Sequence, residues 1–180
     1  GTLGPERTVA FLNECFDLIT ARLLDHGATV DKYIGDAILA YLGAPIETDD
    51  HAQRAVAAAI AVQRAINERN RSCELAGKPF VRLEVGIGIH SGPVVVGNIG
   101  SELKMDYTAI GEPVNVANRM QALAGPGQIK ITGEVRERLG ELIDVKPLIT
   151  HTVGLGDAES AFRLASDRSQ AMKAQIVFSG

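Results

Sequence analysis

Residues 106–120, DYTAIGEPVNVANRM, join a strand to a helix. The segment 105–111 is short and mostly apolar, which is typical of a strand, and it leads into a helix that we expect over 113–124. The run Gly125-Pro126-Gly127 ends that helix. This stretch therefore predicts a strand that passes directly into a helix.

Two polar residues of this helix are candidates for anion recognition. Asn115 and Arg119 are four residues apart, so they share one helix face. A guanidinium matches a phosphate with two parallel hydrogen bonds, and an amide can hold a hydroxyl. The same pair is also typical of a solvated polar face, and the spacing does not decide between the two readings.

Upstream, residues 81–90 alternate between apolar and other residues, which predicts a strand over that whole range. Gly86 and Gly88 leave one face of it bare, so that another backbone or a ligand can approach closely. We expect a second strand at 93–97, which would form a hairpin with the first around Ser91-Gly92.

Further upstream, residues 29–41 predict two strands joined at Gly35-Asp36, because a Gly-Asp link between apolar runs is a hairpin signal. Asp36 at the tip can project a carboxylate clear of the sheet. Lys32 lies four residues earlier in the same hairpin, and by itself is typical of a solvated strand lysine.

Helices and strands are mixed along the chain. We expect an amphipathic helix from Pro5 to a stop at Gly27, and a second helix opened by Asp49 and Asp50. Further strands are expected at 128–131, near 142–145 and near 160–165, and a further helix at 134–139. Because hairpin strands are mixed with helices, the pattern predicts an α+β fold with one sheet covered by helices.

Composition narrows the class of protein. The chain has 180 residues, a formal net charge of −4, and two cysteines, Cys15 and Cys73. This length predicts one domain, the charge argues against a nucleic-acid partner, and the cysteines fit a reducing, cytoplasmic compartment. No apolar run approaches the ~20 residues of a membrane span, and residues 1–20 do not read as a signal peptide. The motifs of dinucleotide-binding folds, phosphate loops, hydrolase elbows and zinc proteases are missing.

Three stretches together resemble the catalytic domain of class III adenylyl and guanylyl cyclases. They are VDKYIGDAILA (30–40), GIGIHSGPVVVGNIG (86–100) and the opening stretch, 106–120, in this order. The resemblance covers about residues 3–165 and implies a catalytic domain over 1–165, with a ferredoxin-like sheet of βαββαβ type covered by helices. It also implies a head-to-tail homodimer with active sites between protomers, regulatory domains fused in the parent protein, and a role in signal transduction.

The resemblance also implies roles for single residues. Asp36 matches a ligand of two divalent cations, Mg²⁺ or Mn²⁺. Lys32 and Thr108 match the two positions that select the base; lysine accompanies adenine, and the threonine resembles a subgroup that includes bicarbonate-responsive enzymes. Asn115 matches the residue that positions the ribose, and Arg119 the one that stabilises charge on the phosphates. The implied reaction converts ATP to 3′,5′-cyclic AMP and pyrophosphate.

The chain departs from the family pattern at two places. The family's first metal-binding aspartate lies in an opening strand, and the sequence begins at GTLGPE, after that point. The tail, 166–180, ends in QIVFSG, which resembles the start of that strand with Gly180 at the aspartate position. We therefore hypothesise that residues 175–179 supply the missing strand; a tag or linker tail is the alternative. Val153 stands where the family often has a lysine for the terminal phosphates.

Two functions of different classes follow from these observations. The first is an adenylate cyclase. The second is a cyclase-like module that dimerises and binds nucleotide without turning it over, which the two departures favour. A guanylyl cyclase is a third reading, against which the charge of Lys32 argues, and a diguanylate cyclase lacks its Gly-Gly-Asp/Glu-Glu-Phe signature.

Overall fold

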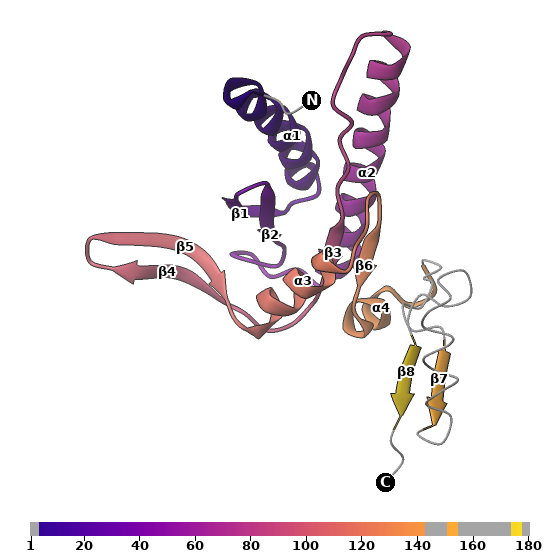
Figure 1. The fold of residues 1–180 in the computed structure, drawn as a ribbon. Coiled ribbons are helices and arrows are strands. Elements are labelled where there is room, and N and C mark those ends of the chain that lie inside the picture. Colours follow the sequence, from indigo (N-terminus) through magenta and orange to yellow (C-terminus); the bar gives the residue numbers. More distant parts are fainter. Residues whose placement is uncertain (1–3, 143–150, 155–173, 178–180) are drawn as a thin grey trace. The chain divides into compact units, whose positions relative to one another are not determined.

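The computed structural model describes residues 4–142, 151–154 and 174–177 (Figure 1). The chain divides into two units, residues 1–140 and 141–180, each described by itself. Within the described residues, helices are mixed with four two-stranded sheets, which confirms the α+β class. No helix among these residues has the length and apolar character that crossing a membrane requires.

The helices of the first unit lie close to where the periodicity predicts them. They are α1 (Pro5–Asp25), α2 (His51–Leu75), α3 (Glu112–Ala122) and α4 (Gly133–Leu139). A 3₁₀ turn, η1 (Gly140–Leu142), follows α4 where the first unit ends. Gly27 follows α1 with a φ of 77°, and its N–H donates to the carbonyl of Leu24, so the expected stop is confirmed.

The first hairpin has the predicted turn. Strands β1 (Thr29–Ile34) and β2 (Ala37–Tyr41) pair antiparallel around Gly35 and Asp36. Gly35 adopts a φ of 63°, which a glycine accepts without steric cost. The expectation that Asp36 lies at a hairpin tip is therefore confirmed.

The predicted strand at 81–90 is shorter than expected. Only β3 (Ile87–Ile89) is a strand, and it pairs in parallel with β6 (Ile129–Ile131), the strand expected at 128–131. Before it, side chains of α2 bind the backbone: Asn70 donates to the Leu83 carbonyl and accepts from its N–H, and Gln63 donates to the Val85 carbonyl. The alternating pattern correctly predicted an extended chain here. It did not predict the missing strand partner, because side chains of α2 satisfy the backbone hydrogen-bonding groups of this segment as well as a neighbouring strand would.

The hairpin expected around Ser91-Gly92 is wrong. Strand β4 (Val95–Ser101) pairs instead with β5 (Lys104–Ile110), through seven residue pairs from Val95–Ile110 to Ser101–Lys104. The physical reason lies partly in Pro93, which has no N–H to donate to a ladder at the start of the expected strand. The longer run beyond residue 97 instead finds a continuous partner in β5.

Helix α3 packs directly on the bare face of β3. A Cβ on Gly88 would collide with backbone atoms of Ala117 and Gln121, and one on Gly86 with the carbonyl of Ala124. The predicted close approach to these glycines is confirmed, and the approaching backbone is that of α3 and its C-terminal end. The other side of this layer holds the core, where Cys15, Val62, Ile66 and Leu83 are buried together.

In the second unit, β7 (His151–Gly154) pairs in parallel with β8 (Ala174–Val177). The strand expected near 160–165 lies outside the described residues, as do residues 143–145 of the other expected strand. The hypothesis that 175–179 supplies the opening strand of the cyclase sheet stays a prediction.

Candidate active site

The site begins with an irregularity in β1. The β1–β2 ladder pairs Val30 with Ala40 and Lys32 with Leu39, so Asp31 is an extra residue between two regular pairs. Such a bulge bends the strand and re-aims a side chain. The Asp31 side chain is 0% exposed, which places a carboxylate inside the protein.

Strand β5 supplies hydrogen bonds to this carboxylate. The Thr108 hydroxyl donates to Asp31 Oδ2 at 2.7 Å, and the backbone N–H of Ala109 donates to the same oxygen at 3.0 Å. Thr108 and Ala109 are themselves buried. A buried carboxylate needs such partners because leaving water unpaired is costly. The contact joins residues 77 positions apart in the sequence.

Lys32 approaches the second oxygen of the same carboxylate. Its Nζ lies 3.5 Å from Asp31 Oδ1, and its side chain is 39% exposed. Oδ1 has no hydrogen-bond partner within the described residues. Thus the structure brings the two predicted base-selecting residues, Lys32 and Thr108, to opposite oxygens of one aspartate.

A tyrosine shares this environment. The Tyr41 hydroxyl at the end of β2 is buried and has no hydrogen-bond partner among the described residues. Burial raises the pKa of Tyr41, and the proximity of Tyr107 and the Asp31 charge raises it further. The junction of β1, β2 and β5 therefore favours Tyr41 in its neutral form.

The α3 residues lie in a different environment. Asn115 and Arg119 are both exposed, and neither side chain makes a hydrogen bond or ion pair with another described residue. Gly111 and Pro113 begin the helix directly after β5, so Thr108 and Asn115 lie on consecutive elements. Both side chains are thus available to a ligand, as the anion-recognition reading requires.

Sequence reasoning missed Asp31. Under strict alternation, Asp31 lies on the strand face opposite Lys32, where an aspartate is expected to be exposed to solvent. The signal that could have found it is an aspartate inside an apolar strand directly before Lys32, since a buried carboxylate there requires donors from elsewhere.

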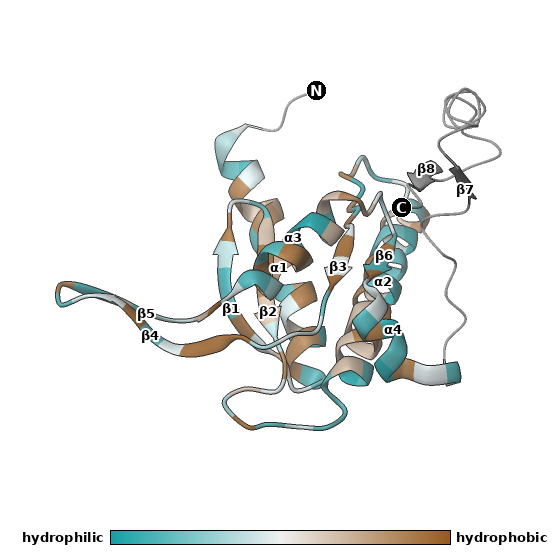
Figure 2. Ribbon diagram, turned by 90° about the horizontal axis from the view of Figure 1, so that it is seen from below, coloured by the Kyte–Doolittle hydropathy of each residue, from teal (hydrophilic) through white to brown (hydrophobic). Residues whose placement is uncertain are grey.

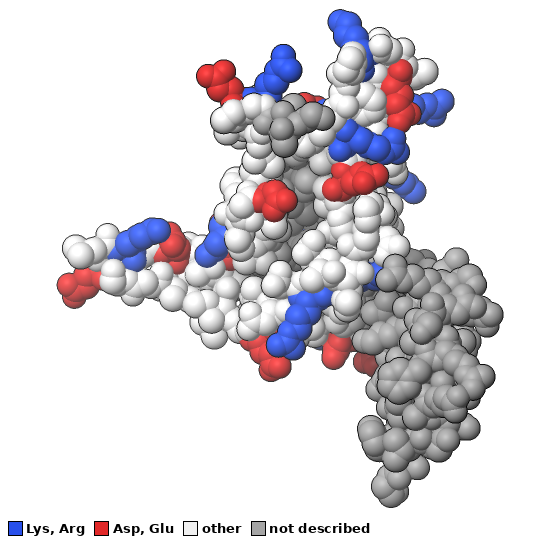
Figure 3. All heavy atoms as spheres, viewed as in Figure 1, with Lys and Arg blue, Asp and Glu red and all other residues white. Residues whose placement is uncertain are grey.

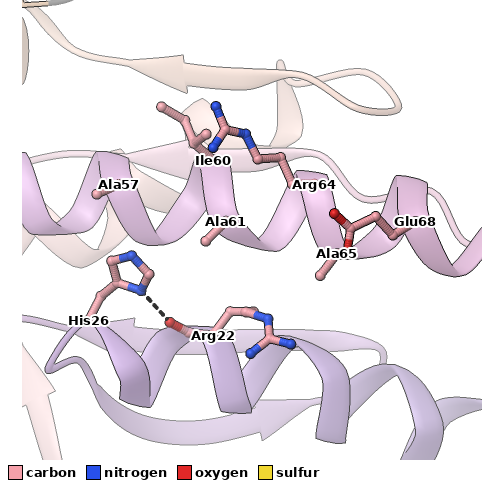
Figure 4. A pocket seen from close by; sticks show the side chains of 8 residues that line it. All are labelled: Arg22, His26, Ala57, Ile60, Ala61, Arg64, Ala65 and Glu68. Atoms are coloured by element: carbon pink, nitrogen blue, oxygen red, sulfur yellow. Dashed lines mark hydrogen bonds between the residues drawn. The ribbon is translucent and has the colours of Figure 1, made fainter.

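A hollow of about 520 Å³ lies elsewhere, between α1 and α2 (Figure 4). It is lined by Arg22, His26, Arg64, Glu68, Ile60 and three alanines of α2. None of the predicted site residues lines it, and its polar groups partly satisfy one another, with His26 Nδ1 2.8 Å from the Arg22 carbonyl oxygen.

Comparisons with known proteins identify the class as a class III nucleotidyl cyclase catalytic domain. The chain belongs to the family described as the adenylate and guanylate cyclase catalytic domain, which matches residues 2–156. It is 32% identical to adenylate cyclase 1 of Rhizobium meliloti over 82% of its length, and 38% identical to an adenylate cyclase of Anabaena cylindrica over 67%. It spans 22% and 24% of these two relatives, roughly a quarter of each.

Solved structures support the same family. The guanylyl cyclase Cya2 is 39% identical with a TM-score of 0.74, over 81% of this chain and 73% of that one. The adenylyl cyclase CyaB from P. aeruginosa is 30% identical with a TM-score of 0.72, over 79% and 73%. One of these neighbours is a guanylyl cyclase and the other an adenylyl cyclase, so the similarity establishes the family but not which base this chain selects.

Class III cyclases generally use divalent metal ions. Asp36 is exposed at its hairpin tip and offers one carboxylate, the hard oxygen ligand that Mg²⁺ prefers. Among the described residues, no three side chains of histidine, cysteine, aspartate or glutamate cluster in a way that could hold an ion. Among the described residues, Asp36 can therefore serve as one metal ligand, but these residues do not form a complete site for two ions.

Proposed function

We propose that this chain is an adenylyl cyclase domain that converts ATP to 3′,5′-cyclic AMP and pyrophosphate. The observation that carries the proposal is the pairing of Lys32 and Thr108 across Asp31. A lysine ammonium can donate to N1 of adenine, which is an acceptor, whereas N1 of guanine carries a hydrogen. Unpaired or mismatched polar groups in a site discriminate strongly between bases.

The phosphates and ribose are assigned to α3. Arg119 pairs its guanidinium with the phosphate oxygens, where charge grows as pyrophosphate leaves. Asn115, one turn earlier on the same face, holds the ribose so that its 3′-oxygen faces the α-phosphorus. A bond then forms between O3′ and the α-phosphorus, the bond from that phosphorus to the β-phosphate oxygen breaks, and the 3′-hydroxyl proton leaves to solvent. Asp36 would be one ligand of a divalent cation, which when bound would help to neutralise the charge of the phosphates.

We further propose that the domain works as a head-to-tail homodimer. The β4–β5 hairpin extends away from the rest of its unit, and Figure 2 shows apolar residues along it. Its exposed apolar side chains are Val95, Leu103, Met105, Tyr107 and Ile110. Charged residues of both signs accompany them near the hairpin end (Figure 3), including Lys104 and Asp106, whose charged atoms are 3.9 Å apart. Exposed apolar patches rimmed by polar residues mark interaction sites.

The second candidate is a nucleotide-binding module without turnover. Val153, where the family often has a phosphate-binding lysine, favours it, as does the incomplete set of described metal ligands. Fused regulatory domains also belong to the proposal, because the chain spans only about a quarter of the curated relatives named above.

Incubation with ATP and Mn²⁺, followed by measurement of cyclic AMP, separates these candidates. We expect product, and we expect Arg119→Ala to lower kcat by ~100-fold, the size seen when one transition-state donor is removed. Arg136→Ala, an exposed arginine of α4, is the matched control and should retain activity. ATP binding without any cyclic AMP would instead establish the module.

A further inference from the structure

Thr108 has a single hydroxyl proton, and the structure shows where it goes. The hydroxyl donates to Asp31 Oδ2 at 2.7 Å, and the Ala109 N–H holds the same oxygen at 3.0 Å. An ionised carboxylate accepts hydrogen bonds and cannot donate one. With its proton committed to Asp31, the Thr108 oxygen retains only its acceptor lone pairs.

We propose that Asp31 is the positioning residue that sets base selectivity, because it fixes the Thr108 hydroxyl as an acceptor. A threonine left to itself is ambiguous, since its hydroxyl rotates and can donate or accept. The amino group on C6 of adenine donates hydrogen bonds, whereas guanine has an acceptor oxygen at that carbon. A hydroxyl locked as an acceptor therefore suits adenine and meets guanine with two opposed lone pairs. The proposal rests on the proposed function, in which Thr108 faces the base.

The geometry around Asp31 supports this role. The bulge in β1 directs the carboxylate towards β5, and the side chain is 0% exposed, so water does not compete for the Thr108 proton. The Ala109 N–H comes from the rigid backbone next to Thr108, and it anchors Oδ2 on the strand that presents the hydroxyl. Orientation of the hydroxyl is thereby built into the junction before any nucleotide arrives.

The same carboxylate also acts on Lys32. Oδ1 lies 3.5 Å from Lys32 Nζ and has no other polar partner among the described residues. An ammonium has three protons, so attraction towards Oδ1 leaves others for N1 of the base. One buried aspartate thus positions a donor and an acceptor, the pair that the N1 and C6 edge of adenine requires.

The test compares the ratio of kcat/KM for ATP to that for GTP in four proteins: wild type, Asp31→Ala, Thr108→Val and the double variant. We expect Asp31→Ala to lower the ratio by ~10-fold, since the freed hydroxyl can then donate to guanine. In the Thr108→Val background, the effect of Asp31→Ala on the ratio should shrink to the part that acts through Lys32, because no hydroxyl remains to be oriented. Asp17→Ala, an exposed aspartate of α1, is the control and should match wild type.

Conservative variants separate positioning from simple structural support. Asp31→Asn keeps an acceptor oxygen for Thr108, so the ratio should be retained even where activity falls. Thr108→Ser keeps the hydroxyl and should also retain it. If Asp31→Ala does not fold, Asp31→Leu keeps the branching at Cγ without an acceptor and is expected to show the same lowered ratio.

Equal losses on ATP and GTP in a folded Asp31→Ala or Asp31→Leu variant would overturn the proposal. An effect of Asp31→Ala that stays the same size when Thr108 is valine would overturn it too. Calorimetric binding of ATP and GTP to the same variants gives the ratio without turnover. A wild type that binds ATP more tightly than GTP but makes no cyclic AMP would refute the cyclase and leave this inference standing on the binding ratios. A wild type that binds both nucleotides equally would overturn it.

Discussion

The junction of β1, β2 and β5 and the exposed face of α3 use polar residues in opposite ways. At the junction, the buried Asp31 carboxylate receives two hydrogen bonds from β5. On α3, Asn115 and Arg119 are exposed and make no side-chain hydrogen bond to another described residue. Fixed groups can discriminate between similar bases, because the cost of orientation is met during folding. Solvated groups can follow a phosphate whose charge changes during the reaction.

The largest effect is expected when the charge of Lys32 at the junction is reversed. Lys32→Glu should lower kcat/KM for ATP by ~100-fold and that for GTP far less, because it replaces the donor for N1 of adenine with an acceptor. The measurement is the steady-state rate with each nucleotide. Lys78→Glu, at an exposed loop position, is the control and should change neither rate. Equal losses on both nucleotides would remove Lys32 from base selection.

A second variant disturbs the packing of α3 on β3 and leaves the junction of β1, β2 and β5 unchanged. Gly88→Ala puts a methyl group into the backbone of α3, so we expect the free energy of unfolding to fall by about 2 kcal/mol. Urea denaturation measures the change. Gly97→Ala is the matched control in a strand, because a Cβ there meets nothing within 4 Å. Similar stabilities for the two variants would show that α3 does not rest on Gly88.

The hairpin tests whether two protomers share the site. Met105, 60% exposed on β5, can become Asp without a burial cost in the monomer. If β4–β5 packs on a second protomer, Met105→Asp should weaken dimerisation by ~10-fold, because the buried charge lacks a partner. Sedimentation equilibrium measures the constant. Leu75→Asp, at a position 80% exposed on α2, is the control and should leave the dimerisation constant unchanged. Equal effects of the two variants on this constant would exclude the hairpin from the dimer interface.

The smallest expected effect concerns Tyr41. Burial is the largest cause of its raised pKa and the Asp31 charge a lesser one, so Asp31→Asn should lower the pKa of Tyr41 without returning it to the ordinary 10.0. Because the folded-state pKa is above the unfolded one, the associated stability is complete below pH 10 and is lost as pH rises through the folded pKa. Ultraviolet titration of the Tyr41 phenol measures this pKa. If Asp31→Asn leaves the pKa of Tyr41 unchanged, the charge of Asp31 does not act on the Tyr41 hydroxyl.

Local signals in the sequence predicted much of the fold and the exposed part of the site. Pro5 and Gly27 marked the limits of α1, and Gly35-Asp36 marked the first hairpin, because these residues act on the backbone within one turn. The spacing of Asn115 and Arg119 fixed their common face, since helix geometry alone determines it. Three ordered stretches were enough to predict the family to which the chain belongs.

Only the tertiary structure decided which strands pair and what surrounds a buried charge. Alternation marked the extended chain around Ile89, and a strand was also expected around Val95. Neither signal gave the partner strand, because a strand's own residues do not determine which edge it meets. The role of Asp31 could not be predicted for a related reason. The bulge turns its side chain to the face opposite the one that alternation predicts, and its partners on β5 lie 77 and 78 positions away in the sequence. The sequence by itself determined the chemical groups available for recognition. Long-range packing determined which way a single hydroxyl proton points.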